Sequence, residues 1–257
     1  MKDPRDIQTQ DVIALSEGTT MLKRYIEFSS LREVKVPQFL IDTLNRLEVC
    51  LGKPLTQEGQ AIVPLLDRVN PEFNLPQAPI LEKSGYVHKL YKISLKHLLK
   101  QTETGLDLQD IKLVGTYLAN LSVSTPSAQY WNLVYVAFNQ IDELFINEAR
   151  LRTLISIETQ MSNFFKDSAQ YKPELHDVAN ILSLCISQDD EISQYIREKV
   201  NVGEDILSDA QLQVFSRHLY GPDFDTIHTI SELVTTEMHQ VRNDIEFNYQ
   251  NMSPEKT

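Results

Sequence analysis

The stretch PQFLIDTLNRLEVCLG, residues 37–52, decides the fold class. Its leucines recur every three or four residues, which places them on one face of a helix; they are Leu40, Leu44, Leu47 and Leu51. Pro37 suits the first helical position, where its missing N–H is not needed, and Gly52 suits the left-handed conformation that ends many helices. The stretch therefore predicts an amphipathic helix whose apolar face packs on other helices.

The rest of the chain repeats this pattern. Its 257 residues are 42% hydrophobic, which is enough for a packed core, and with only 8 glycines they show little sign of the hairpin turns of sheet proteins. We predict an all-α fold, a bundle or bundles of about eight to ten helices. The expected helices cover residues 8–28, 37–52, 59–67, 80–101, 106–121, 126–145, 147–165, 174–187 and 208–220, and a further one begins near residue 189.

Two of these helices carry specific expectations about burial. The helix over residues 8–28 is expected to turn Leu22, Tyr25 and Ile26 inward. The helix over residues 126–145 is expected to have Thr125 as its N-cap, because a threonine hydroxyl can accept a bond from a first-turn N–H. The buried stripe of this second helix is expected to comprise Trp131, Val134, Phe138, Ile141 and Phe145.

The positions of the prolines and of the expected helices predict that the chain is divided into three parts. Five prolines fall between residues 53 and 79, which indicates an irregular crossover. We therefore expect an N-terminal helical segment over residues 1–75, a main helical bundle over residues 76–229 and a C-terminal helix over residues 230–257. Apolar side chains at helical spacing make residues 230–250 amphipathic, and this helix is expected to lead into a further module.

Composition excludes several classes of partner and compartment. A formal net charge of −12 disfavours nucleic acid, because proteins that bind phosphate backbones carry a basic excess. Cys50 and Cys185 lie in apolar helical runs without metal-ligand spacing, as expected of free thiols in a reducing compartment. The opening residues, MKDPRDIQTQDV, lack the apolar core of a signal peptide, and no apolar run approaches the roughly 18 residues that a membrane span needs. We expect a cytoplasmic protein whose partners are other proteins; its oligomeric state stays open.

The segment LKHLLKQ contains the first candidate for chemistry. His97 and Lys100 are three residues apart and so share one side of a helix, the arrangement of a phosphoaccepting histidine in phosphotransfer domains. Gln101 stands where those domains have a small residue, and Lys96 stands in place of an alanine. These departures argue against activity, and phosphotransfer at His97 is kept as an alternative.

A row of lysines surrounds this histidine on an otherwise acidic chain: Lys89, Lys92, Lys96 and Lys100. Their spacing places them on one side of the predicted helix, and we call them the lysine ridge. Such a row is commonly a solvated helix face. The alternative is a docking surface for an acidic partner.

His176 and Asp177 form the second candidate, because metal phosphohydrolases of the HD superfamily use such a doublet. In that superfamily the metal is also bound by another histidine and a further carboxylate. In this chain His88 or His97 could supply the histidine. Available carboxylates are Asp189, Asp190, Asp205 and Asp209. The lysine common three residues after the doublet is absent, so we interpret it as first-turn polar residues of a helix. No nucleotide-binding or hydrolase motif occurs either, and we expect no enzyme, no metal and no cofactor.

Residues 16–59 and residues 236–248 together resemble the family that comprises the pilus scaffold FimL and the N-terminal region of the kinase ChpA. The matching positions are Gly18, Tyr25, Ile26, Pro37, Leu40, Asn45, Leu47, Pro54, Leu55 and Glu58, followed by Glu237, Val241, Arg242, Asp244, Ile245 and Glu246. The segment around Trp131 resembles the family's tryptophan-bearing helix.

The resemblance implies helical bundles related to phosphotransfer domains, without a phosphorylatable histidine. It also implies a bacterial scaffold for the chemosensory system of type IV pili, with effects on twitching motility and cyclic AMP, placed at the cell pole through a partner. We therefore expect a non-catalytic scaffold that acts by protein–protein interaction.

Overall fold

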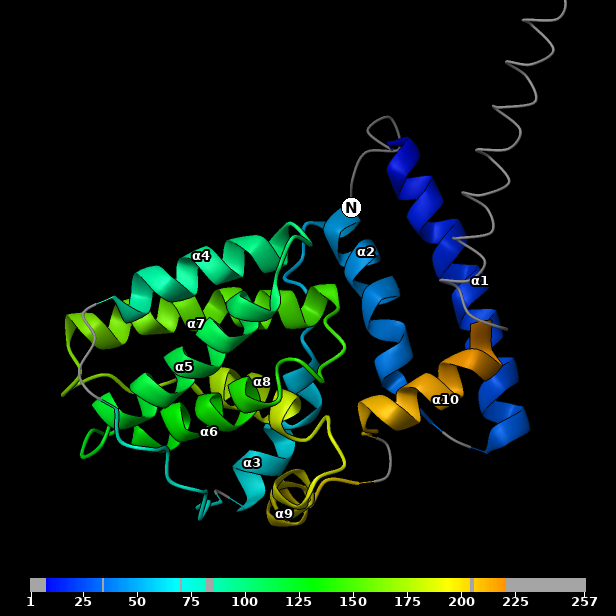
Figure 1. The fold of residues 1–257 in the computed structure, drawn as a ribbon. Helices are drawn as coiled ribbons and strands as arrows, with labels where there is room; N and C mark the ends of the chain where they lie inside the picture. Colours follow the sequence, from blue (N-terminus) through cyan, green and yellow to red (C-terminus); the bar gives the residue numbers. More distant parts are fainter. Residues whose placement is uncertain (1–7, 34, 70, 82–85, 204–205, 221–257) are drawn as a thin grey trace, which may run out of the picture. The chain divides into compact units, whose positions relative to one another are not determined.

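The computed structural model describes residues 8–33, 35–69, 71–81, 86–203 and 206–220 (Figure 1). The chain divides into two compact units, Met1–Leu212 and Gln213–Thr257. The expected helix over residues 230–250 lies outside the described residues.

The described residues confirm the all-α prediction, with ten α-helices and no strand among them. The α-helices are α1 (Thr9–Arg32), α2 (Ile41–Leu51), α3 (Val63–Val69), α4 (Val87–Leu99), α5 (Gly105–Leu121), α6 (Ala128–Asn139), α7 (Glu148–Lys166), α8 (Leu175–Cys185), α9 (Glu191–Val200) and α10 (Asp209–Tyr220). Two short 3₁₀ helices, η2 (Pro37–Leu40) and η3 (Glu58–Ala61), precede α2 and α3. The relation to phosphotransfer bundles and the three-part division stay predictions.

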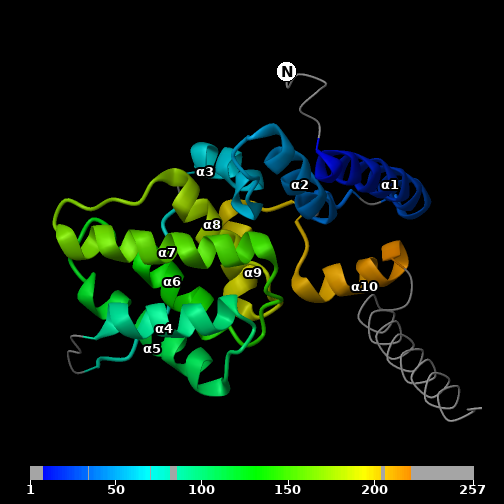
Figure 2. The ribbon, with the colours of Figure 1, turned by 90° about the horizontal axis from the view of Figure 1, so that it is seen from above.

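Helices α4 to α8 form a bundle around an aromatic core (Figures 1 and 2). Tyr91 of α4 stacks on Phe138 of α6 with ring centroids 5.5 Å apart, and Trp131 of α6 lies 5.2 Å from Phe164 of α7. Helices α5 and α6 approach closely at Gly115, where a Cβ would lie 3.1 Å from the Cβ of Phe138. The bundle thus fixes the position of α4, which carries the lysine ridge.

Helices α1 and α2 form an antiparallel hairpin beside this bundle, with α2 between α1 and the bundle (Figures 1 and 2). Phe28 meets Phe39 edge-on at 6.1 Å, and Gly18 fits under Leu47. The left-handed conformation of Gly52, with φ of 62°, ends α2 as predicted. The first turn of the predicted helix is the 3₁₀ turn η2.

Burial on α1 differs from the prediction. Tyr25 is half-buried, but Leu22 and Ile26 are exposed, whereas Ala14, Gly18, Met21 and Phe28 face inward. The helix has two apolar stripes, and the hairpin covers the one that contains Gly18, where an added Cβ would lie only 3.3 Å from Leu47 Cδ1. The prediction for Leu22 and Ile26 was therefore wrong.

Helix α6 also differs from its predicted bounds. It begins at Ala128 with Ser127 as N-cap, because the hydroxyl of Thr125 donates instead to the carbonyl of Ser122 at 2.8 Å. It ends at Asn139, and the turn that follows leaves Phe145 exposed. Trp131, Val134, Phe138 and Ile141 are buried as predicted. Likewise α4 begins at Val87, and residues 80 and 81 are not helical.

Candidate functional site

Helix α4 presents the lysine ridge on its outer face. Its inner face, formed by Val87, Tyr91, Leu95 and Leu98, is buried, and the hydroxyl of Tyr91 donates to the carbonyl of Leu154 on α7 at 2.8 Å. Because the buried residues follow helical spacing, the residues on the opposite side of the helix point outward. All four ridge lysines, Lys89, Lys92, Lys96 and Lys100, are exposed.

Two large apolar side chains lie among these lysines. Ile93 is 45% exposed and Leu99 is 44% exposed. Ile93 is four residues after Lys89 and three before Lys96, so it lies between them on the helix surface. The outer face of α4 thus combines positive charge with apolar contact area.

One ridge lysine has an ion pair with α7. Lys92 Nζ lies 3.0 Å from Glu158 Oε1, and His88 Nε2 lies 2.6 Å from the same oxygen. Burial raises the pKa of Glu158, but the bonds from His88 and Lys92 outweigh it and hold this pKa below its ordinary value. Lys89, Lys96 and Lys100 make no ion pair with another described residue. Most of the ridge charge is therefore not neutralised within the described part of the chain.

The structure places His97 at the C-terminal end of α4, next to the start of α5. Its Nδ1 lies 2.7 Å from Asp107 Oδ1, and the other carboxylate oxygen accepts bonds from the backbone N–H and the hydroxyl of Thr104, both at 2.8 Å. The His97 side chain is partly exposed, and Lys100 is the C-cap of the same helix. Sequence reasoning missed Asp107, although Thr104 and Asp107 have the spacing of a capping box.

Among the residues that the structure describes, the His176 and Asp177 doublet is not part of a metal site. Asp177 is buried and accepts bonds from Ser156 and Gln160, while His176 is exposed. Among the other proposed carboxylates, Asp189 accepts a bond from Ser208, Asp190 caps α9 and Asp209 binds Arg150, whereas Asp205 lies outside the described residues. No group of three or more His, Cys, Asp or Glu side chains in the described ranges could hold a metal ion.

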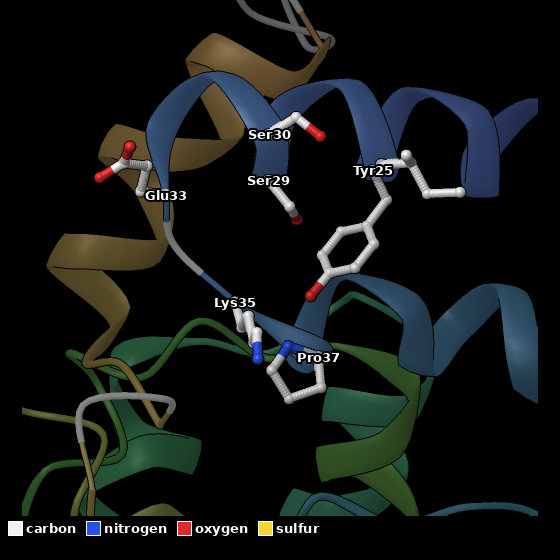
Figure 3. Close-up of a pocket in the computed structure, with 7 residues that line it drawn as sticks. Tyr25, Ser29, Ser30, Glu33, Lys35 and Pro37 are labelled. Atoms are coloured by element: carbon white, nitrogen blue, oxygen red, sulfur yellow. The ribbon is translucent and has the colours of Figure 1, made fainter.

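A second surface feature is a hollow of about 590 Å³ at the C-terminal end of α1 (Figure 3). Its walls come from α1 and from the segment that joins α1 to η2: Tyr25, Ile26, Ser29, Ser30, Glu33, Lys35 and Pro37. The Tyr25 hydroxyl accepts the backbone N–H of Val36 at 3.0 Å, which ties this segment to the helix. Ser29 Oγ is buried without a hydrogen-bond partner in the described structure.

Comparison with known proteins gives one informative similarity. The chain is 22% identical over 241 residues to the scaffold protein FimL of Pseudomonas aeruginosa, which covers 89% of this chain and 42% of FimL. The chain thus spans less than half the length of that relative. No protein-family model matches the chain, and no solved structure matches it significantly. No helix in the described ranges is long and apolar enough to cross a membrane.

Proposed function

We propose that the chain is a non-catalytic scaffold of a type IV pilus chemosensory system and that it binds an acidic partner protein through the lysine ridge. The observation that carries the proposal is the similarity to the scaffold protein FimL along 89% of the chain. We propose that the scaffold acts in the bacterial cytoplasm and that a partner places it at the cell pole. There it would affect twitching motility and cyclic AMP signalling.

The electrostatics of α4 support the ridge as the binding surface. Lysines three and four residues apart repel one another, which costs a helix a few tenths of a kcal/mol per pair. Lys92 finds a carboxylate on α7, but Lys89, Lys96 and Lys100 find none in the described structure. Carboxylates of a partner would relieve this repulsion. The ridge would therefore favour partners with acidic surfaces, although the chain as a whole has a net charge of −12.

The apolar residues of the ridge support binding rather than mere solvation. A charged rim steers association, whereas desolvated apolar contacts at the centre of an interface supply most of the affinity. Ile93 and Leu99, both nearly half exposed, lie on either side of the row of lysines and add apolar contact area to it. We therefore expect the partner to present an acidic helix that also carries apolar side chains.

The test is capture of partners from a bacterium with type IV pili, followed by titration of the purified partner. Lys89→Glu, Lys96→Glu and Lys100→Glu together are expected to weaken binding about a hundredfold, since three charge pairs become repulsive. The control reverses three other exposed lysines, Lys53, Lys172 and Lys199. Equal binding by both triple variants would refute the ridge. Capture of no pilus-signalling protein by the wild type would refute the scaffold itself.

Phosphotransfer at His97 is the second candidate function, and the bond to Asp107 is the observation that favours it. A carboxylate that holds Nδ1 fixes the imidazole and leaves Nε2 as the nucleophilic nitrogen. Incubation with a phosphorylated response regulator separates the candidates. A scaffold gives no acid-labile phosphate on the wild type, whereas phosphate on the wild type and none on His97→Gln would favour phosphotransfer.

A further inference from the structure

Helix α1 carries a second apolar stripe that the hairpin leaves uncovered. Val12, Leu15, Leu22 and Ile26 are 57%, 60%, 49% and 55% exposed, and we call them the α1 seam. At 100° per residue, the seam lies roughly 120° around the helix from the stripe that faces α2. With Thr19 between Leu15 and Leu22, the spacings are three, four, three and four residues, the heptad pattern of a coiled coil.

The seam is suited to another long helix. Helix α1 has 24 residues and so is about 36 Å long, whereas α2 has 11. The apolar side chains of the seam are spread over four turns in a straight row, which matches the facing row of a helix better than a compact pocket.

We propose that the seam joins two copies of this chain through an antiparallel pair of α1 helices. Antiparallel coiled coils place the first apolar position of the heptad against the fourth position of the other helix. The register that sets Leu15 against Ile26 of the second copy also sets Leu22 against Thr19 and Val12 against Ser29. A two-fold axis then passes between residues 20 and 21, and each contact occurs twice.

Charge on the flank of the seam favours this orientation. In the heptad pattern of the seam, Asp11 and Arg32 occupy the same flanking position, three heptads apart, near the two ends of α1. Antiparallel pairing brings Asp11 of one copy next to Arg32 of the other, at both ends of the interface. Antiparallel packing also places the positive end of each helix dipole beside the negative end of the other.

The hollow at the end of α1 lies in this interface. Ile26, Ser29 and Ser30 form part of its wall (Figure 3), and the proposed register places Val12 of the second copy at Ser29. The N-terminal turn of one α1 would thus enter the hollow of the other copy.

The first experiment measures the mass of the full chain in solution at high micromolar concentration by sedimentation equilibrium. We expect a dimer, and we expect Leu15→Glu with Leu22→Glu to raise its dissociation constant at least about tenfold. The matched control is Ile13→Glu with Leu31→Glu, which alters exposed apolar residues of the same helix roughly 145° from the seam and is expected to leave the dimer intact.

Far-UV circular dichroism checks that each variant keeps its helix content, and Leu15→Glu alone replaces the double variant if it does not. A monomeric wild type overturns the proposal, since the seam would then serve a different protein or another part of the chain. A dimer that survives the seam substitutions overturns it as well.

The second experiment tests the orientation by disulfide formation in a Cys50→Ser background. Chains with Val12→Cys and chains with Ser29→Cys are expected to cross-link when mixed, and neither is expected to cross-link alone. Cross-linking of each variant with itself would show a parallel pair and overturn the antiparallel arrangement.

Discussion

Arg150 joins parts of the first unit that are far apart in the sequence. Its guanidinium makes a two-pronged contact with Asp209, with both distances 2.7 Å, and its Nε lies 3.1 Å from Glu58. The residue is only 2% exposed. Burial lowers the pKa of Arg150, but Asp209 and Glu58 more than offset this effect and raise it above the ordinary value. The arginine therefore stays charged and holds η3, α7 and the start of α10 together.

The first prediction concerns this contact. Arg150→Met is expected to lower the free energy of unfolding by about 3–5 kcal/mol, because it leaves two carboxylates without their cation in a buried place. Urea unfolding followed by circular dichroism measures the loss. Arg46→Met is the control, since the exposed pair of Arg46 with Glu17 should contribute at most about 1 kcal/mol. Equal losses in the two variants would contradict the role of Arg150.

The second prediction concerns Asp107 and acid. Hydrogen bonds hold the pKa of Asp107 below its ordinary value of 3.8. The bond from the Thr104 backbone N–H has the largest effect, and the bonds from His97 and from the Thr104 hydroxyl have smaller ones. A carboxyl with a lowered folded pKa contributes stability above its unfolded pKa, and this contribution is lost as the pH falls through the folded pKa. Asp107→Asn should therefore flatten the fall of the melting temperature below about pH 4.

The control for that measurement is Asp110→Asn, which removes a carboxyl of the same helix that makes none of these bonds. It is expected to keep the acid dependence of the wild type. If the profiles of the two variants coincide, the bonds around Asp107 do not contribute to acid stability.

At the scale of elements, η3 packs directly on α8. A Cβ on Gly59 would lie 2.5 Å from the backbone nitrogen of Asn180 and 2.6 Å from the carbonyl carbon of Ala179. Since these atoms belong to the backbone of a buried helix, they cannot move aside as a flexible side chain would. The glycine thus determines how closely the segment before α3 approaches the bundle.

The third prediction follows from this contact. Gly59→Ala is expected to destabilise the protein by about 1–3 kcal/mol, because η3 must move away from α8. Gly105→Ala is the control: nothing lies within 4 Å of the Cβ it would add, so it should be neutral or stabilising by up to about 1 kcal/mol. Thermal unfolding of both variants measures the difference. If Gly59→Ala is neutral, the contact between η3 and α8 at Gly59 does not limit how closely they approach.

Helix α1 shows what periodicity leaves undecided at this scale. Its apolar residues were correctly predicted to be helical, but the helix has two stripes, and either one has the spacing of a buried face. Packing chose the stripe with Gly18, because the missing side chain allows Leu47 to come close. The exposed stripe, with Leu22 and Ile26, is the surface for which we propose a second copy.

At the scale of the molecule, charge is unevenly distributed. The chain has a formal net charge of −12, yet four lysines lie on the outer face of one helix. A uniformly acidic protein would repel an acidic partner, whereas a local basic surface can bind it within a screening length of about 8 Å at physiological salt. The ridge is therefore a local feature that the overall charge conceals.

The fourth prediction is a salt dependence of partner binding. Raising the ionic strength from about 0.05 M to about 0.5 M should weaken binding of the acidic partner to the wild type, because exposed charge pairs are screened. The variant with Lys89, Lys96 and Lys100 changed to glutamate should not show this weakening. Titration calorimetry at the two salt concentrations measures it, and an unchanged affinity of the wild type would contradict an electrostatic interface.

The sequence by itself determined the helices of this protein. The spacing of apolar residues and the glycine at position 52 act within one or two turns, so their consequences can be read without knowledge of distant residues. The same locality explains the lysine ridge, whose exposure follows from the buried residues between its members. Errors at the ends of α4 and α6 arose where turns compete with helix over a few residues.

Only the tertiary structure decided which stripe of α1 is covered, that Arg150 meets Glu58 and Asp209, and that Asp107 holds His97. It also showed that Asp177 and Asp209 are buried and bonded to other side chains. These outcomes depend on which residues meet across long stretches of chain, and no local pattern encodes that choice. The physical reason is that burial and charge pairing are gained between elements, after each helix has its own form.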